Sequence, residues 1–214
     1  MNTTSIKSPS LGNAINRGWA IYKNNFVTLF VATLLAGLVS SATCGICSGA
    51  MTCGLLGIVL ALLRGNEPKP AIGSVFDGFK KFLPSFVVSL VINLVSFVLN
   101  AILGLVPIVG LLASIVFVAF VAPAVLYWAL FLVQDRNASI GDAIGAVPSL
   151  LGKKEFWSFA LVVFVAGLLS AVGVIACGIG LLFTIPIGVC IAGAAMEECM
   201  GAPDAGESAP ETAE

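Results

Sequence analysis

The chain has 214 residues, of which 59% are hydrophobic and only 10% are charged, and its formal net charge is −1. Soluble domains are about 25% charged, and so few charged residues cannot give a soluble core of this size a polar surface. The composition therefore excludes an ordinary soluble domain and favours a membrane protein.

Three long blocks of the sequence contain no Asp, Glu, Lys or Arg: residues 25–63, 82–134 and 156–196. One helical crossing of a bilayer takes about 20 residues, so each block can hold two crossings. Turn candidates lie near the block centres, at residues 44–47, 104–110 and 177–180. The sequence thus predicts an all-α membrane bundle of six transmembrane helices arranged as three hairpins.

A short amphipathic segment precedes each block, at residues 10–26, 71–82 and 139–156. Each begins with a small residue, an aliphatic residue and a glycine, and each carries lysine ahead of an aromatic residue. We interpret these segments as cytoplasmic interfacial helices and the chain as a threefold internal repeat, with copies at residues 10–66, 67–134 and 135–198. The alternative is that juxtamembrane segments are commonly amphipathic and basic without any repeat.

The parts outside this membrane domain, which covers residues 10–200, are short. Residues 1–9 form a polar N-terminal lead. Residues 201–214 are rich in Ala, Pro, Gly and Glu. A segment of that composition cannot bury a core, so we expect a disordered acidic tail.

The distribution of basic residues predicts the topology. All ten Lys and Arg residues lie in the amphipathic segments or their flanks, and the predicted hairpin turns carry none. The positive-inside rule then puts both termini on the cytoplasmic side of the inner (cytoplasmic) membrane of a bacterium or archaeon. We expect six of these residues to contact anionic lipids of the inner leaflet: Arg17, Lys23, Lys80, Lys81, Lys153 and Lys154.

A stripe of polar residues follows one face of the third predicted span: Ser89, Asn93, Ser96 and Asn100. Two interpretations are open. The stripe could line a wet or ligand-lined pathway, or it could form hydrogen bonds between helices that stabilise the bundle by about 0.6–2 kcal/mol each. Serine and asparagine commonly join membrane helices, and we favour the structural interpretation.

Small residues recur four positions apart in other predicted spans. Gly49, Cys53 and Gly57 form one series in the second span, and Thr184, Gly188 and Ala192 form another in the sixth. Such spacing lets helix backbones approach closely, so it predicts packing surfaces.

Cys44 and Cys47 form a Cys-x-x-Cys pair at the first predicted outer turn, and we expect Cys177 at the same depth in the third hairpin. In an oxidising compartment the pair could form a disulfide with which the third thiol exchanges. No Lys, Arg or His lies nearby in the sequence to lower a thiol pKa. We therefore favour a structural disulfide or free thiols over redox catalysis.

The sequence offers little support for an enzyme. It has no histidine, which is the commonest general base and metal ligand, and no carboxylate within the predicted spans. We predict no catalytic residue, no cofactor and no metal site, and we expect that the protein is not an enzyme.

Several short motifs resemble one family: residues 14–23, Leu63-Arg64-Gly65, Pro123 ahead of residues 132–135, and residues 176–180 ahead of Thr184. Over residues 10–196 the chain resembles uncharacterised prokaryotic six-helix integral membrane proteins related to the membrane domain of glycerophosphodiester phosphodiesterases. The resemblance implies a shared helical membrane fold. It implies no activity, because the chain has no room for the phosphodiesterase's catalytic barrel of about 250 residues, and no catalytic residue carries over.

These observations favour a non-enzymatic membrane module that binds lipid, or a membrane-protein partner, at the inner leaflet through its basic helices. One alternative is a small-solute transporter or exporter that uses the polar face of the third helix. A second is a membrane thiol-disulfide protein that uses Cys44 and Cys47. We expect no nucleic-acid partner.

Overall fold

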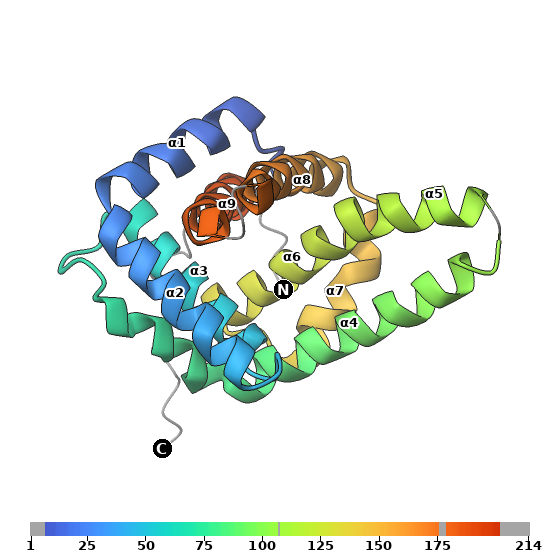
Figure 1. Cartoon of the computed structure of the whole chain (residues 1–214), viewed down its shortest axis with the longest axis horizontal. Helices are drawn as coiled ribbons and strands as arrows, with labels where there is room; N and C mark the ends of the chain where they lie inside the picture. Colours follow the sequence, from blue (N-terminus) through green and yellow to red (C-terminus); the bar gives the residue numbers. More distant parts are fainter. Residues whose placement is uncertain (1–6, 107, 176–178, 202–214) are drawn as a thin grey trace, which may run out of the picture.

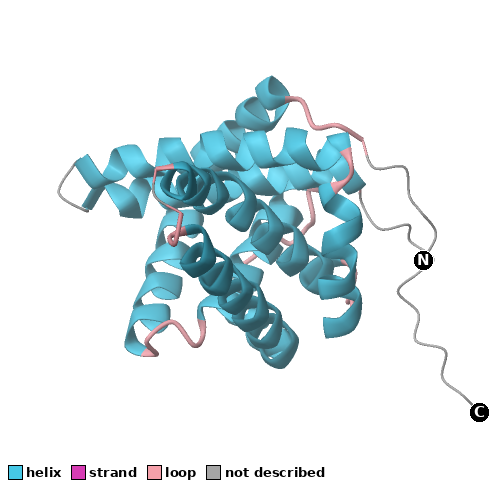
Figure 2. Cartoon of the chain, turned by 90° about the vertical axis from the view of Figure 1, so that its right-hand side faces the viewer, coloured by secondary structure: helices cyan, strands magenta, loops and turns pink. Residues whose placement is uncertain are grey.

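The computed structural model of the chain describes residues 7–106, 108–175 and 179–201. All regular elements in these ranges are helices, as Figure 1 and Figure 2 show, so the predicted all-α fold is confirmed. In chain order they are α1 (Leu11–Asn24), α2 (Phe26–Ala42), α3 (Ser48–Leu63), η1 (Ile72–Lys81), α4 (Phe82–Leu103), α5 (Val109–Val116), η2 (Phe117–Val121), α6 (Ala122–Asp135), α7 (Ile140–Leu151), α8 (Lys154–Ile175) and α9 (Ile179–Met200).

Four helical stretches are long and apolar enough to cross a membrane: Ile72–Leu103, Val109–Asp135, Lys154–Ala171 and Phe183–Met200. A fifth is added if α1 and α2, which meet at an angle of 94°, count as one bent span. α3 is apolar but has only 16 residues. The structure is thus that of a helical membrane protein, although length and composition support four or five spans rather than the six that we predicted.

The three predicted amphipathic segments are helical, but each packs against other helices. α1 lies across α9, and a Cβ atom at Gly18 would lie 2.8 Å from the backbone of Ile191. The second segment, η1, is a 3₁₀ helix that runs into α4 and packs along α3. α7 lies across α4 and α6, where Ala143 is fully buried. One face of each segment therefore belongs to the protein core.

α3 is the central helix of the fold. It contacts α1, α2, η1, α4, α6 and α9, and its sequence is apolar on all sides, which is typical of a buried helix. Glycines allow the neighbouring backbones to come close: a Cβ at Gly54 would overlap the carbonyl of Val75, and a Cβ at Gly78 would overlap the carbonyl of Ala50.

The predicted small-residue series are confirmed as packing surfaces. A Cβ at Gly49 would lie 2.7 Å from the carbonyl oxygen of Ser85, and one at Gly57 would lie 2.8 Å from the amide nitrogen of Gln134. In the α8–α9 hairpin, a Cβ at Gly188 would overlap the hydroxyl of Ser170 on the facing helix, so no larger residue fits there without a shift.

The hairpins are not parallel to one another. In Figure 1, α4 and the α5–α6 segment extend across the picture as two arms, whereas α8 and α9 are strongly foreshortened. α7 crosses between the two arms. This arrangement leaves the outer parts of the two arms without covering helices.

Replacing Gly54 by alanine tests the close contact between α3 and η1. We expect Gly54→Ala to lower the free energy of unfolding by roughly 1–3 kcal/mol, because the added methyl group overlaps backbone that cannot move aside easily. The matched control is Gly37→Ala in α2, where a Cβ meets nothing within 4 Å. Thermal unfolding in detergent, followed by tryptophan fluorescence, compares the two; equal midpoints would contradict the packing described here.

Candidate functional site

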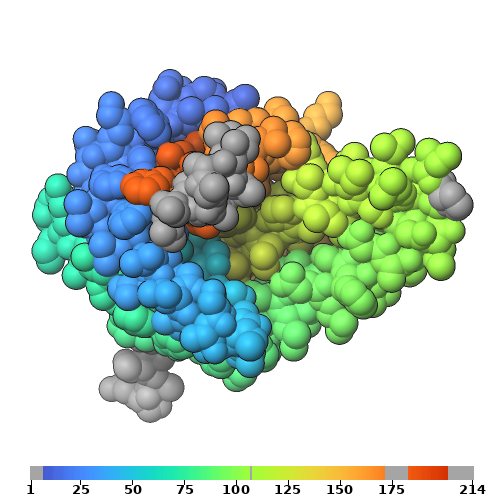
Figure 3. All heavy atoms as spheres, in the orientation of Figure 1, coloured from blue at the N-terminus to red at the C-terminus, as the bar shows by residue number. Residues whose placement is uncertain are grey.

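A groove of about 670 Å³ lies between the two arms that α4 and α5–α6 form; Figure 3 shows these arms side by side as space-filling surfaces. Most of its wall is apolar, with polar side chains confined to a few positions. The lining residues are Ile92, Asn93, Ser96, Phe97 and Asn100 of α4, Val118 of η2, and Ala122, Pro123, Leu126 and Tyr127 of α6.

Three residues of the predicted polar stripe lie on this groove: Asn93, Ser96 and Asn100. The Asn93 amide donates to the carbonyl of Ser89 one turn earlier, at 2.7 Å. In the described part of the chain, the side chains of Ser96 and Asn100 form no hydrogen bond. These three side chains therefore do not form, with the described residues, the interhelical hydrogen bonds that we favoured from the sequence.

Ser89 has a different position from the rest of the stripe. It is only 7% exposed and lies against Gly49 of α3, away from the groove. Its hydroxyl has no hydrogen-bond partner among the described residues. The stripe thus divides into a buried part that packs on α3 and an open part that lines the groove.

The backbone on the opposite wall of the groove is irregular. Residues Phe117–Val121 form a π-helix, in which the amide of Ala122 donates to the carbonyl of Phe117, five residues back. Pro123, the second residue of α6, has no N–H to donate. Single π-helical turns occur frequently at functional sites. Nothing in the sequence indicated the π-helix.

A second feature, a cluster of charges, joins the ends of three helices. The Arg64 guanidinium, after the end of α3, donates to Asp135 of α6 at 2.6 and 3.1 Å and to Glu197 of α9 at 2.8–3.2 Å. The three side chains are 19%, 6% and 10% exposed. Burial alone would lower the pKa of Arg64, but the hydrogen bonds and charges of the two carboxylates raise it overall, so the guanidinium stays charged.

Two more basic residues hydrogen-bond to helix ends. The Lys81 ammonium donates to the carbonyls of Val133 and Gln134 at the C-terminus of α6. Arg136 donates to the carbonyls of Met200, the last residue of α9, and Gly201, the next residue, at 3.0 and 3.2 Å. Both satisfy carbonyl groups that a helix leaves free at its end.

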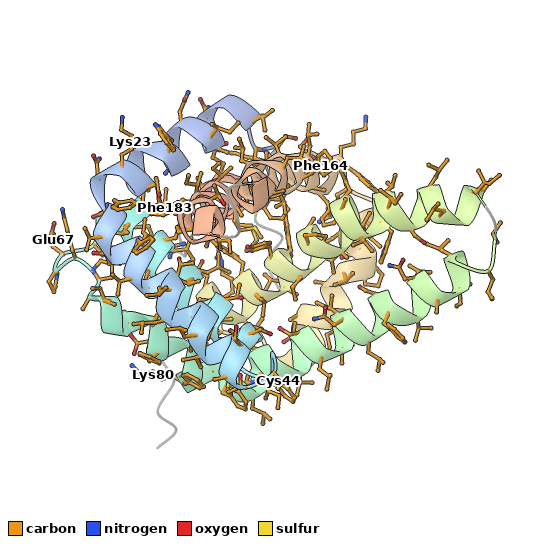
Figure 4. The ribbon with its side chains drawn as sticks, in the orientation of Figure 1. Lys23, Cys44, Glu67, Lys80, Phe164 and Phe183 are labelled. Atoms are coloured by element: carbon orange, nitrogen blue, oxygen red, sulfur yellow. The ribbon has the colours of Figure 1, made fainter. Side chains whose placement is uncertain are left out.

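Most of the other basic residues expected at the inner leaflet are more exposed to the surroundings of the protein than Arg64 is. Arg17, Lys23, Lys80 and Lys154 are exposed, and Lys153 is half-buried. Figure 4 shows Lys23 and Lys80 pointing away from the helices; Lys23 lies 5.9 Å from the Trp19 ring, and Lys80 pairs with Asp77 at 2.8 Å. Lys81 differs from our expectation because its charge is used within the protein.

Cys44 and Cys47 are both free thiols, the first exposed and the second half-buried. Cys44, which is labelled in Figure 4, has a φ of 50° and lies at the turn between α2 and α3. Cys177, the third member of the predicted set, lies outside the described residues. In the described ranges, no group of three or more His, Cys, Asp or Glu side chains could hold a metal ion.

No family model, curated protein or solved structure matches this chain. The resemblance to the phosphodiesterase-associated membrane proteins therefore remains a sequence-based expectation, and no residue role is transferred from a relative. The candidate sites rest on the chemistry and geometry of this chain alone.

Removing the Arg64 charge tests the cluster. We expect Arg64→Gln to lower the free energy of unfolding by about 3–5 kcal/mol, because it leaves the buried Glu197 without a counterion and Asp135 with only the Arg136 guanidinium, 3.6 Å away. The triple variant Arg64→Met, Asp135→Leu, Glu197→Leu should recover most of that loss, since both buried carboxylates are then removed.

The control for this prediction is Lys80→Gln, which breaks a surface pair of the kind that contributes little to stability. Thermal unfolding in detergent compares the variants. If Arg64→Gln were no more destabilised than Lys80→Gln, the cluster would not hold the three helix ends together.

Proposed function

We propose that this protein is a non-enzymatic membrane module that binds an amphiphilic molecule in the groove between α4 and α5–α6. The observation that carries the proposal is the mixture of side chains in the groove: hydrogen-bonding groups without partners in an otherwise apolar wall. A transporter or exporter that moves such a molecule is the related alternative, because its substrate would occupy the same groove.

The unpaired polar groups support a ligand with hydrogen-bonding capacity. Ser96 and Asn100 have no intramolecular partner among the described residues, and the same holds for the Tyr127 hydroxyl. Polar groups left unpaired in an apolar environment cost free energy, and within a bilayer little water is present to pair with them. A bound molecule that offers hydroxyl or carbonyl groups would remove this cost.

The absence of charge in the groove narrows the ligand class. None of its lining residues is Asp, Glu, Lys or Arg, and a charged group at membrane depth needs a partner of opposite charge. The apolar remainder, which includes Phe97, Val118 and Leu126, matches a hydrocarbon chain. We infer an uncharged amphiphile, with a hydroxyl or ester group attached to a long apolar chain.

Replacing two groove amides tests this function. We expect Asn93→Leu combined with Asn100→Leu to weaken binding of monooleoylglycerol, a single-chain uncharged amphiphile, roughly tenfold, because two hydrogen bonds worth about 0.5–1.5 kcal/mol each are lost. Native mass spectrometry of the full chain in detergent measures the bound fraction at each concentration.

The matched control is Val95→Leu with Ile102→Leu, two exposed positions of α4 that do not line the groove. This variant carries the same number of substitutions on the same helix and should bind as the parent does. Equal binding by the two double variants, with both folded, would refute the groove as the ligand site.

We also propose the finer topology predicted from the sequence: six spans formed by a threefold repeat, with both termini cytoplasmic. What supports it is the ion-pair cluster at Arg64. This cluster joins the C-terminal ends of the second helices of the three proposed units, which are α3, α6 and α9. The exposed Trp19, Arg17 and Lys23 of α1 suit an interfacial helix on anionic lipid. Because the hairpins are not parallel to one another, six crossings require each hairpin to tilt at its own angle to the membrane normal.

Labelling of Cys44 tests this topology. In a variant that retains only this exposed cysteine, a membrane-impermeant maleimide should label intact cells from outside. A matched variant that retains only Cys199 should stay unlabelled until the cells are opened and the protein is unfolded, because Cys199 is 1% exposed. If Cys44 reacted only in opened cells, the proposed orientation would be inverted.

A further inference from the structure

A second, smaller cavity of about 210 Å³ lies on the other side of α6, between α6, α8 and α9. Its wall is apolar except for the hydroxyls of Ser170 and Tyr127. The Ser170 hydroxyl lies 2.9 Å from the carbonyl oxygen of Ala166 and 3.1 Å from that of Thr184. That hydroxyl is therefore already paired. The cavity offers no free hydrogen-bonding group from α8 and suits a hydrocarbon chain.

The two cavities share a wall. Pro123 and Tyr127 line both of them. The π-helix η2 contributes to both as well, because Val118 faces the groove and its neighbour Ala119 faces the second cavity. The two spaces thus meet along side chains of a single helical segment.

The shared wall also has an irregular helical backbone. Pro123 cannot donate to the carbonyl of Ala119 four residues earlier, and the π-helix directly before it has already shifted the hydrogen-bond register. Tyr127, one turn after Pro123, has no hydrogen-bond partner for its hydroxyl in the described part of the chain. The wall therefore carries a polar group at the junction between two apolar spaces.

We infer that the groove and the second cavity form one site for a two-chain uncharged amphiphile. One chain lies in the groove, the other lies in the second cavity, and the polar group that joins the chains meets the Tyr127 hydroxyl. This inference rests on the proposed groove function and adds to it the number of chains, the position of the second chain and the residue at the branch point.

The test compares dioleoylglycerol with monooleoylglycerol on the full chain by native mass spectrometry in detergent. Gly167 of α8 lines the second cavity, and a Cβ there meets nothing within 4 Å, so Gly167→Phe can extend into the space without displacing backbone. We expect this variant to bind dioleoylglycerol roughly tenfold more weakly, a change of about 1.4 kcal/mol, and to bind monooleoylglycerol as the parent does.

A second variant covers the case in which the new phenyl ring of Gly167→Phe turns outward. Ala192→Leu enlarges a residue that is 2% exposed in the wall of the same cavity, and it should give the same selective loss. The matched control is Gly37→Phe in α2, where a Cβ also meets nothing within 4 Å and no cavity residue is near in the sequence; it should change neither affinity.

The outcomes separate this inference from the proposed function. If neither cavity variant lowers dioleoylglycerol binding while Asn93→Leu with Asn100→Leu still weakens monooleoylglycerol binding, the second-chain site is wrong and the groove stands. If the groove variant leaves monooleoylglycerol binding unchanged, the groove function itself fails. Loss of both ligands in Gly167→Phe, or an equal loss in Gly37→Phe, would also overturn the second-chain site.

Discussion

The close approach of backbones around α3 is the constraint on which the rest of the fold depends. Membrane helices gain little from a hydrophobic effect between them, so they associate where small residues let them pack tightly. Gly54 and Gly78 bring η1 onto α3, and Gly49 brings α4 onto it. Because η1 runs directly into α4, this contact also sets where the α4 arm begins, and the groove lies along that arm.

The charged residues stabilise the same arrangement at the helix ends. Arg64, Asp135 and Glu197 form a bidentate network in which each buried charge has a partner, and such pairing is what makes buried charge tolerable. Lys81 and Arg136 extend this pattern by binding the carbonyls at the ends of α6 and α9. Packing thus fixes the helices along their length, and electrostatics fixes them where they end.

Sequence reasoning predicted the helical membrane class, the series of Gly49, Cys53 and Gly57, and a polar stripe of which Asn93, Ser96 and Asn100 line a groove. These follow from composition and helical periodicity, which are local properties. Sequence reasoning missed the partners of Arg64, because Asp135 and Glu197 are 71 and 133 residues away from it along the chain. A signal did exist, since each lies near the end of the second helix of a predicted repeat. The π-helix and the second cavity depend on how α6 meets α8 and α9, which no local pattern reports.

The π-helix has a consequence for how the groove can change over evolution. A π-helical turn is an α-helix that carries one additional residue. Because the wide turn absorbs that residue, deleting one residue from Phe117–Val121 would restore regular α-helical geometry and leave α5 facing α4 as before. The same deletion in a regular α-helix would turn everything beyond it by about 100°. The wall of the groove can therefore lose or gain a single codon in this segment and keep its place against α4.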